Sequence, residues 1–150
     1  MEAVKYLVIH CTDTPEGRNI SSDDIRRWHL EERGWNQVGY TDMIHLDGRV
    51  ERLVANDDDA YVEGWEITNG AKGYNRYCRH IVYVGGKSRN GRVNQDTRTP
   101  EQIKALTQYC LDFHAVAPAA KIVGHNFLNK AKACPCFDVK AFVKSIGIKQ

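Results

Sequence analysis

Two histidines and one cysteine are the residues of this chain best suited to bind a metal ion. His125 and Cys134 lie in the stretch KIVGHNFLNKAKACPCFD, residues 121–138, and His10 lies near the start of the chain. A neutral imidazole and a thiolate are the commonest ligands of zinc, a borderline-soft cation. Lys132, two residues before Cys134, would add a positive charge beside such a centre. These residue types predict a zinc site with a lysine next to it.

The separation of His125 and Cys134 along the chain is wider than the tight ligand pairs of zinc fingers, so spacing alone does not identify the site. The stronger argument comes from the segments that carry the histidines. His10 and His125 each end an apolar run, KYLVIH and KIVGH. Open α/β sheets carry their sites at the carboxyl ends of strands. We therefore expect both imidazoles at the same edge of one sheet.

The order of strand and helix signals predicts one α/β domain spanning residues 1–150. Apolar runs predict strands at residues 4–11, 79–86 and 119–124, and a hairpin at 39–54. Ser21, Thr99 and Asp138 are predicted helix starts, because each can cap a helix and precedes apolar residues at helical spacing. A hairpin requires an antiparallel pair, so we expect a mixed central β-sheet flanked by helices.

Three details of these elements are also predicted. His29 on the first helix is interpreted as a structural residue rather than a ligand. Residues 47 and 48, Asp-Gly, are expected to close the hairpin as a type I′ turn. The helix that starts at Thr99 is expected to bury one stripe, formed by Ile103, Leu106, Cys110 and Phe113.

Charge and composition argue against several classes of partner. The net charge of +2 is too small to indicate nucleic-acid binding, and no basic cluster with interleaved aromatic residues occurs. No apolar run is long enough to span a membrane, so we expect no membrane insertion. The N-terminus lacks a signal-peptide pattern, which predicts that the chain is cytoplasmic when made. Five irregularly spaced cysteines favour reduced thiols over a disulfide framework.

Five blocks of sequence, taken together, are similar to a known family. They are VIHCT (8–12), IRRWH (25–29), GW through VGY with the downstream DG (34–48), AKGYN (71–75), and VGH through KACPCFD (123–138). In this order the chain resembles the zinc-dependent N-acetylmuramoyl-L-alanine amidases, which include amidase-type phage lysozymes and the peptidoglycan-recognition proteins. The resemblance covers almost the whole chain and implies their fold.

The resemblance implies a zinc ion held by His10, His125 and Cys134, with water in the fourth position. Tyr40 matches a tyrosine that assists the zinc water, and Lys132 matches a lysine that stabilises the oxyanion of the reaction. The implied function is hydrolysis of the amide bond between N-acetylmuramic acid and L-alanine in peptidoglycan. Such an endolysin-like cell-wall hydrolase, made without a signal, would reach the wall through a separately made holin-type pore.

The chain departs from the family's pattern at several positions near the expected substrate. Family members often carry a histidine where this chain has Gly70, and small residues where it has Arg79 and His80. Thr41 and Asp42 replace the usual start of an aromatic-rich strand. These departures leave the predicted ligands intact and bear on substrate preference.

Two other functions remain open at the level of sequence. One is a peptidoglycan receptor without catalysis, although pure binders of this family tend to lose the cysteine that Cys134 matches. The other is a structural zinc site, in which Cys136 or Cys11 completes four protein ligands and closes the metal to water.

Overall fold

The central sheet has five strands in the order β5-β4-β7-β2-β9. In a computed structural model that describes residues 1–150, its strands are β2 (Tyr6–Cys11), β4 (Asp42–Ile44), β5 (Val50–Arg52), β7 (Cys78–Tyr83) and β9 (Lys121–Gly124). Strands β4, β7, β2 and β9 run parallel, and β5 pairs antiparallel with β4. The expected mixed sheet is therefore confirmed.

Short strands form two further sheets of two strands each. Strand β1 (Glu2–Ala3) pairs antiparallel with β6 (Tyr61–Val62), and β3 (Thr14–Pro15) pairs parallel with β8 (Gly86–Lys87). Two 3-10 turns, Gly64–Glu66 and Asn75–Tyr77, lie in the long connection before β7. None of the helices combines the length and apolar character needed to span a bilayer.

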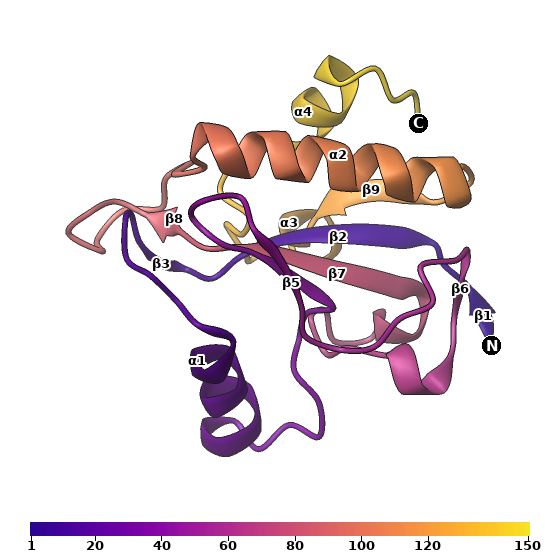
Figure 1. The fold of residues 1–150 in the computed structure, drawn as a ribbon, viewed down its shortest axis with the longest axis horizontal. Helices are drawn as coiled ribbons and strands as arrows, with labels where there is room; N and C mark the ends of the chain where they lie inside the picture. Colours follow the sequence, from indigo (N-terminus) through magenta and orange to yellow (C-terminus); the bar gives the residue numbers. More distant parts are fainter.

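Helices cover both faces of the sheet (Figure 1). α2 (Pro100–Val116) and α4 (Val139–Ser145) lie on one face, while α1 (Ser22–Arg26), continued by the π-helical turn Arg27–Glu32, lies on the other. The short helix α3 (His125–Leu128) follows β9 directly. Strand side chains alternate between the two layers. In β2, Leu7 and Ile9 are buried in the core under α2 and α4, and His10 points to the α1 side.

Side-chain caps start the three predicted helices. The Ser21 hydroxyl accepts the Asp24 N–H (3.1 Å), and the Thr99 hydroxyl accepts the Gln102 N–H (3.0 Å). The Asp138 carboxylate accepts the Ala141 N–H (3.0 Å). Each cap satisfies a backbone donor that has no partner inside the helix. All three predicted starts are confirmed, because this chemistry is local.

The cap at Thr99 predicts a measurable effect on stability. Thr99→Ala should lower the free energy of unfolding by at least about 0.5–2 kcal/mol, the usual cost of a lost N-cap, because the hydroxyl also donates to the Leu46 carbonyl (2.8 Å). Thr107→Ala is the matched control within α2, because its hydroxyl bonds only to the Ile103 carbonyl of the same helix. Urea denaturation of both variants checks this. A Thr99→Ala protein as stable as the wild type would contradict it.

The predicted type I′ turn of the hairpin is wrong. Such a turn needs positive φ at both central residues, and only Gly48 (φ 87°) has it here. The Gly48 N–H donates to the His45 carbonyl and the His45 N–H to the Arg49 carbonyl, each at 2.9 Å. A three-residue loop with glycine in the left-handed region therefore joins the strands. The Asp-Gly pair predicted the hairpin but not its loop length.

The buried stripe of α2 also differs from the prediction at one residue. Leu106, Cys110 and Phe113 are buried, but Ile103 is 38% exposed and Gln102 is fully buried in its place. The Gln102 amide donates to the Val84 carbonyl (3.0 Å) at the end of the central sheet. A polar side chain is stable there because it pairs a backbone group that would otherwise be buried alone.

Candidate metal centre

Parallel pairing of β2 with β9 brings the two histidines together. Ile9 lies opposite Gly124, so His10 and His125 follow at neighbouring positions of the same sheet edge. Their ring centroids are 4.7 Å apart. His10 belongs to the strand itself, and His125 is the first residue of α3. The two imidazoles meet at the carboxyl edge of the sheet, as the strand-end argument predicts.

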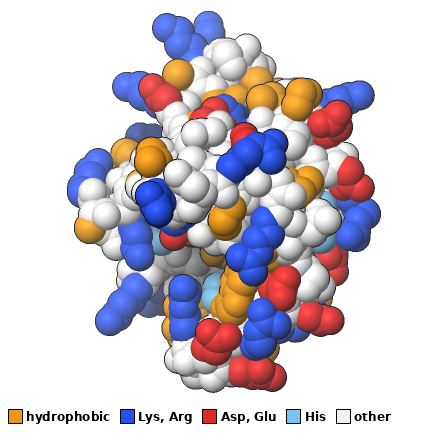
Figure 2. All heavy atoms as spheres, turned by 90° about the vertical axis from the view of Figure 1, so that its left-hand side faces the viewer, with side chains coloured by type: hydrophobic (Ala, Val, Ile, Leu, Met, Phe, Trp, Pro, Cys, Tyr) orange, Lys and Arg blue, Asp and Glu red, His pale blue; other side chains and the backbone are white.

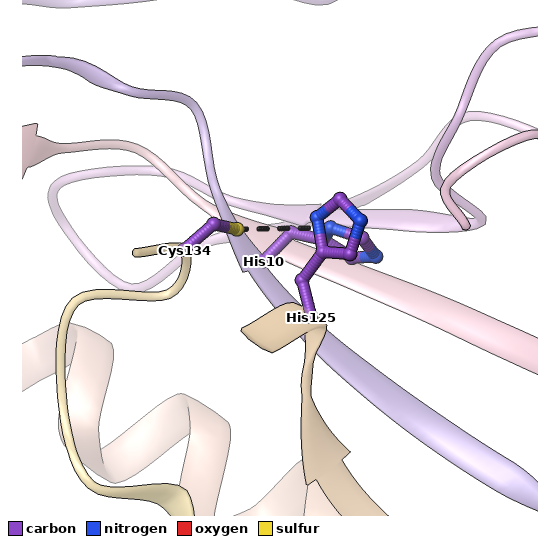
Figure 3. Close-up of side chains that lie close together, drawn as sticks. All are labelled: His10, His125 and Cys134. Carbon is purple, nitrogen blue, oxygen red and sulfur yellow. Dashed lines mark hydrogen bonds between the residues drawn. The ribbon is translucent and has the colours of Figure 1, made fainter. Parts of the chain in front are cut away.

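Cys134 reaches the same place from the loop between α3 and α4 (Figure 3). Its Sγ accepts the backbone N–H of Cys11 (3.2 Å) and lies 3.8 Å from Nδ1 of His10. One ligand atom from each of His10, His125 and Cys134 lies within 4.8 Å of the other two.

These three side chains fit a zinc ion. Zn–N bonds of about 2.0–2.1 Å and Zn–S bonds of about 2.3 Å place tetrahedral ligand atoms about 3.3–3.8 Å apart. The observed separation of 3.8 Å between Cys134 Sγ and His10 Nδ1 agrees with that spacing, and the remaining atoms need only a small inward movement. Two nitrogens and one sulfur also suit zinc chemically.

The ligand atoms lie at a cleft of about 620 Å³. It opens on the face that Figure 2 shows, where a hollow holds histidine and lysine or arginine side chains lie around it. Besides the three ligands, its lining comes from the first helix with its π-helical turn, from the 33–40 and 129–134 loops, and from positions 69–72 and 87. The lining residues include Trp28, His29, Arg33, Trp35, Tyr40, Asn69, Gly70, Lys72, Lys87, Asn129 and Lys132.

Tyr40 and Lys132 both line this cleft. The Tyr40 ring lies 5.1 Å from the His10 ring, centroid to centroid. Burial, together with the sulfur of Cys134, raises the pKa of the Tyr40 phenol above its ordinary value, so the phenol stays protonated. Burial lowers the pKa of His125, and the charge of Lys132 lowers it further. The exposed Lys132 thus places its charge near the centre.

The chain around Lys132 is folded into turns and is not extended. The Lys132 N–H donates to the Asn129 carbonyl (3.0 Å) and the Cys136 N–H to the Ala133 carbonyl (2.8 Å), so two turns flank it. Lys132 and Cys134 nevertheless line the same cleft. Their common orientation comes from the folded loop and not from strand geometry.

Cys11 and Cys136 do not join the ligand group. Cys11 also lines the cleft, but its side chain packs in the core under α2, because β2 alternates its side chains and His10 faces the other way. Cys136 Sγ lies 3.8 Å from Cys11 Sγ, on that same side. The group of potential ligands contains only His10, His125 and Cys134. This arrangement argues against a closed site with four protein ligands.

Most of the departures from the family's pattern lie outside the cleft. Of the five, only Gly70 lines it. Asp42 is buried and ion-paired with Arg52 (3.1 Å), and the Arg79 guanidinium stacks over Phe113 of α2. Thr41, Asp42, Arg79 and His80, which the sequence placed near the expected substrate, therefore do not line the cleft itself. All four residues are buried, and a comparison of sequence blocks does not show which side chains are buried.

Two buried histidines near the centre were not identified as site residues from the sequence. His29 accepts the Gly39 N–H at Nδ1 (2.9 Å) and so holds the loop that carries Tyr40. His80 lies directly behind His10, with Nδ1 2.8 Å from His10 Nε2. The predicted positions of His29 in a helix and His80 in a strand did not indicate these contacts, because each contact joins two different segments of the chain.

The buried histidines predict a loss of stability in acid. Burial lowers the pKa of His29 to about 4 and that of His80 to about 3, against 6.5 for the ordinary side chain. Below pH 6.5 the unfolded chain therefore takes up protons that the folded chain does not. Metal-free protein should lose at least about 2 kcal/mol of unfolding free energy between pH 6.5 and 4.5. Urea melts at several pH values measure this, and equal stability at both ends would contradict it.

Comparison with known proteins identifies the family. The family model described as N-acetylmuramoyl-L-alanine amidase matches residues 1–137. The endolysin of Enterobacteria phage K11 is 34% identical over 144 residues, which cover 96% of this chain and 88% of the relative. The endolysin of Escherichia phage T7 is 32% identical, covering 93% of this chain and 85% of the relative.

Solved structures agree in fold. The Ph2119 endolysin from a Thermus scotoductus bacteriophage has a TM-score of 0.73 at 26% identity, covering 98% of this chain and 87% of that one. The amidase LysC from Clostridium intestinale has a TM-score of 0.75 at 19% identity, covering 99% and 88%. With a family match over nearly its full length, a Cys-His-His group and a cleft beside it, this chain belongs to the N-acetylmuramoyl-L-alanine amidase family and is a peptidoglycan amidase.

Proposed function

We propose that this amidase uses a zinc ion held by His10, His125 and Cys134 to cut the bond between N-acetylmuramic acid and L-alanine. The observation that carries the proposal is the convergence of these three ligand atoms within 4.8 Å at an open cleft. Three protein ligands leave a fourth position free, which is the arrangement of catalytic rather than structural zinc sites.

The protein's own groups account for the remaining requirements of amide hydrolysis. Zinc bound there would supply Lewis-acid charge and a water that ionises near neutral pH. Lys132 would place its ammonium beside the carbonyl oxygen, which becomes negative as the carbon turns tetrahedral. A positive group fixed at that oxygen lowers the free energy of the transition state more than that of the bound substrate.

Tyr40 is proposed as a hydrogen-bond donor. Its phenol stays protonated because burial raises its pKa, so it cannot act as a base near neutral pH. It can donate to the same developing oxyanion or orient the attacking water. The hydrogen bond from Gly39 to His29 holds the backbone next to Tyr40 and so fixes the position of the phenol.

A receptor that binds peptidoglycan without cutting it is the alternative on this fold. Related structures include peptidoglycan-recognition proteins LCa and LCx with bound tracheal cytotoxin. This chain presents a sulfur beside both imidazoles, and a receptor needs no such ligand. Catalysis is therefore the function that the site supports best.

Digestion of purified peptidoglycan followed by mass spectrometry tests the proposal. The expected products are stem peptides with a new free L-alanine amine and intact glycan strands. Enzyme treated with a chelator should release none, and added zinc should restore release. New reducing ends without new amines would instead indicate cleavage between sugars, and binding without products would indicate a receptor.

The relatives suggest how the enzyme meets its substrate. The matched curated relatives from phages are named endolysins. We propose that this chain also acts on the bacterial wall from within, after passing the membrane through a separately made pore.

A further inference from the structure

His10 is one end of a hydrogen-bonded chain that continues through His80 to Asn75. We propose that Asn75 and His80 are positioning residues, which hold the His10 ring in the tautomer that presents Nδ1 to the metal. The inference rests on the zinc site of the proposed function and adds two residues that the ligand motif does not contain.

The geometry of the chain is continuous. His10 Nε2 lies 2.8 Å from His80 Nδ1, and His80 Nε2 lies 3.0 Å from Asn75 Oδ1. The side chains of His10 and His80 are 1% and 0% exposed, so water does not compete for these contacts. Strand pairing sets the approach, because β7 lies parallel beside β2 with His80 opposite Val8.

The direction of each hydrogen bond follows from Asn75. Its Oδ1 also accepts the backbone N–H of Ala71 (2.8 Å), so the atom facing His80 is an acceptor. His80 must therefore donate from Nε2, and its neutral ring then has a lone pair at Nδ1. His10 must donate from Nε2 to that lone pair. The free lone pair of His10 is left on Nδ1, the atom 3.8 Å from Cys134 Sγ.

Metal-binding histidines usually donate their second N–H to a carboxylate or a carbonyl, which fixes the ring and its tautomer. Here a second imidazole takes that place, and its own acceptor is an amide. This imidazole and amide are both neutral, so they would not reduce the positive charge of a bound metal as a carboxylate would.

Gly70 makes room for this arrangement. A Cβ at position 70 would stand 2.6 Å from His80 Nδ1 and 2.6 Å from the Gly39 carbonyl oxygen. Both contacts are far inside van der Waals distance, and one involves backbone that cannot rotate away. Gly70 and His80, two departures from the family's pattern, are thus one packing unit: the ring fits only where position 70 has no side chain.

Two substitutions at position 80 separate the hydrogen bond from the bulk of the ring. His80→Leu fills the space but offers no acceptor to His10, whereas His80→Asn keeps an acceptor near the position of Nδ1. The matched control is His45→Leu, which removes a histidine that bonds to Glu51 and does not line the cleft.

The first readout is zinc affinity, measured by competition with a chromophoric chelator. His80→Leu should bind zinc about 10–100-fold more weakly, the usual cost of losing the partner of a ligand histidine. His80→Asn and His45→Leu should stay close to the wild type. A His80→Leu protein with unchanged zinc affinity would overturn the proposal.

The second readout needs no metal. Long-range ¹H–¹⁵N spectra of metal-free wild-type protein should show His10 protonated at Nε2 and His80 protonated at Nε2, and His80→Leu should lose the single His10 tautomer. A wild-type His10 protonated at Nδ1 would overturn the proposal. If wild-type protein shows the expected tautomers but binds no zinc, the proposed function fails while the chain of hydrogen bonds stands.

Asn75→Ala is the replacement test variant if His80→Leu does not fold. Asn75 is only partly buried, so its loss leaves the core intact and removes the acceptor for His80. The His80 ring should then no longer hold one tautomer, and zinc affinity should fall. An unchanged spectrum together with unchanged affinity would overturn the proposal.

Discussion

Cys134→Ala will lose bound zinc and, with it, measurable amidase activity. The Cys134 sulfur is one of three potential ligand atoms that converge at the cleft, and as a metal-bound thiolate it would supply the only negative charge among them. Loss of an outer hydrogen-bond partner already costs about 10–100-fold in metal affinity, so loss of a ligand should exceed about 100-fold. Metal analysis of the purified variant and its rate of peptide release from peptidoglycan check both effects.

Cys136→Ser is the control for Cys134→Ala. The two cysteines are separated by one residue, but Cys136 faces Cys11 and not the histidines. The control should keep one zinc per chain and most of its activity. Zinc loss in Cys136→Ser, or full zinc retention in Cys134→Ala, would mean that the metal is held by a different set of sulfurs.

Lys132→Met will keep its zinc but lose about two to three powers of ten in turnover. That range is the usual cost of removing one group that stabilises an oxyanion. Zinc content and melting temperature should stay close to the wild type, because Lys132 is exposed and is not a ligand. KM should change little, since the contact belongs to the transition state. Steady-state kinetics on zinc-loaded protein make the measurement.

Lys130→Met is the matched control, since Lys130 is an exposed lysine of the same loop that lies over the Phe127 ring and does not line the metal cleft. Its turnover should stay near the wild-type value. If the Lys132→Met enzyme also has normal turnover, then Tyr40 or the metal stabilises the oxyanion, and Lys132 is only a surface charge.

The sequence by itself determined the features that depend on neighbouring residues. Helix starts at Ser21, Thr99 and Asp138 follow from caps that reach only three residues along the chain. The apolar runs before His10 and His125 placed both imidazoles at strand ends, and the family blocks pointed to Cys134 as the third ligand.

Tertiary structure alone decided the surroundings of these ligands. Gln102 replaces Ile103 in the buried stripe because the Val84 carbonyl, just beyond the end of β7, needs a donor at that point. His80 stands behind His10 because β7 pairs with β2 across about 70 residues of sequence, and Gly70 leaves the space for its ring. Such contacts depend on strand order and register, and no local pattern of residues encodes them.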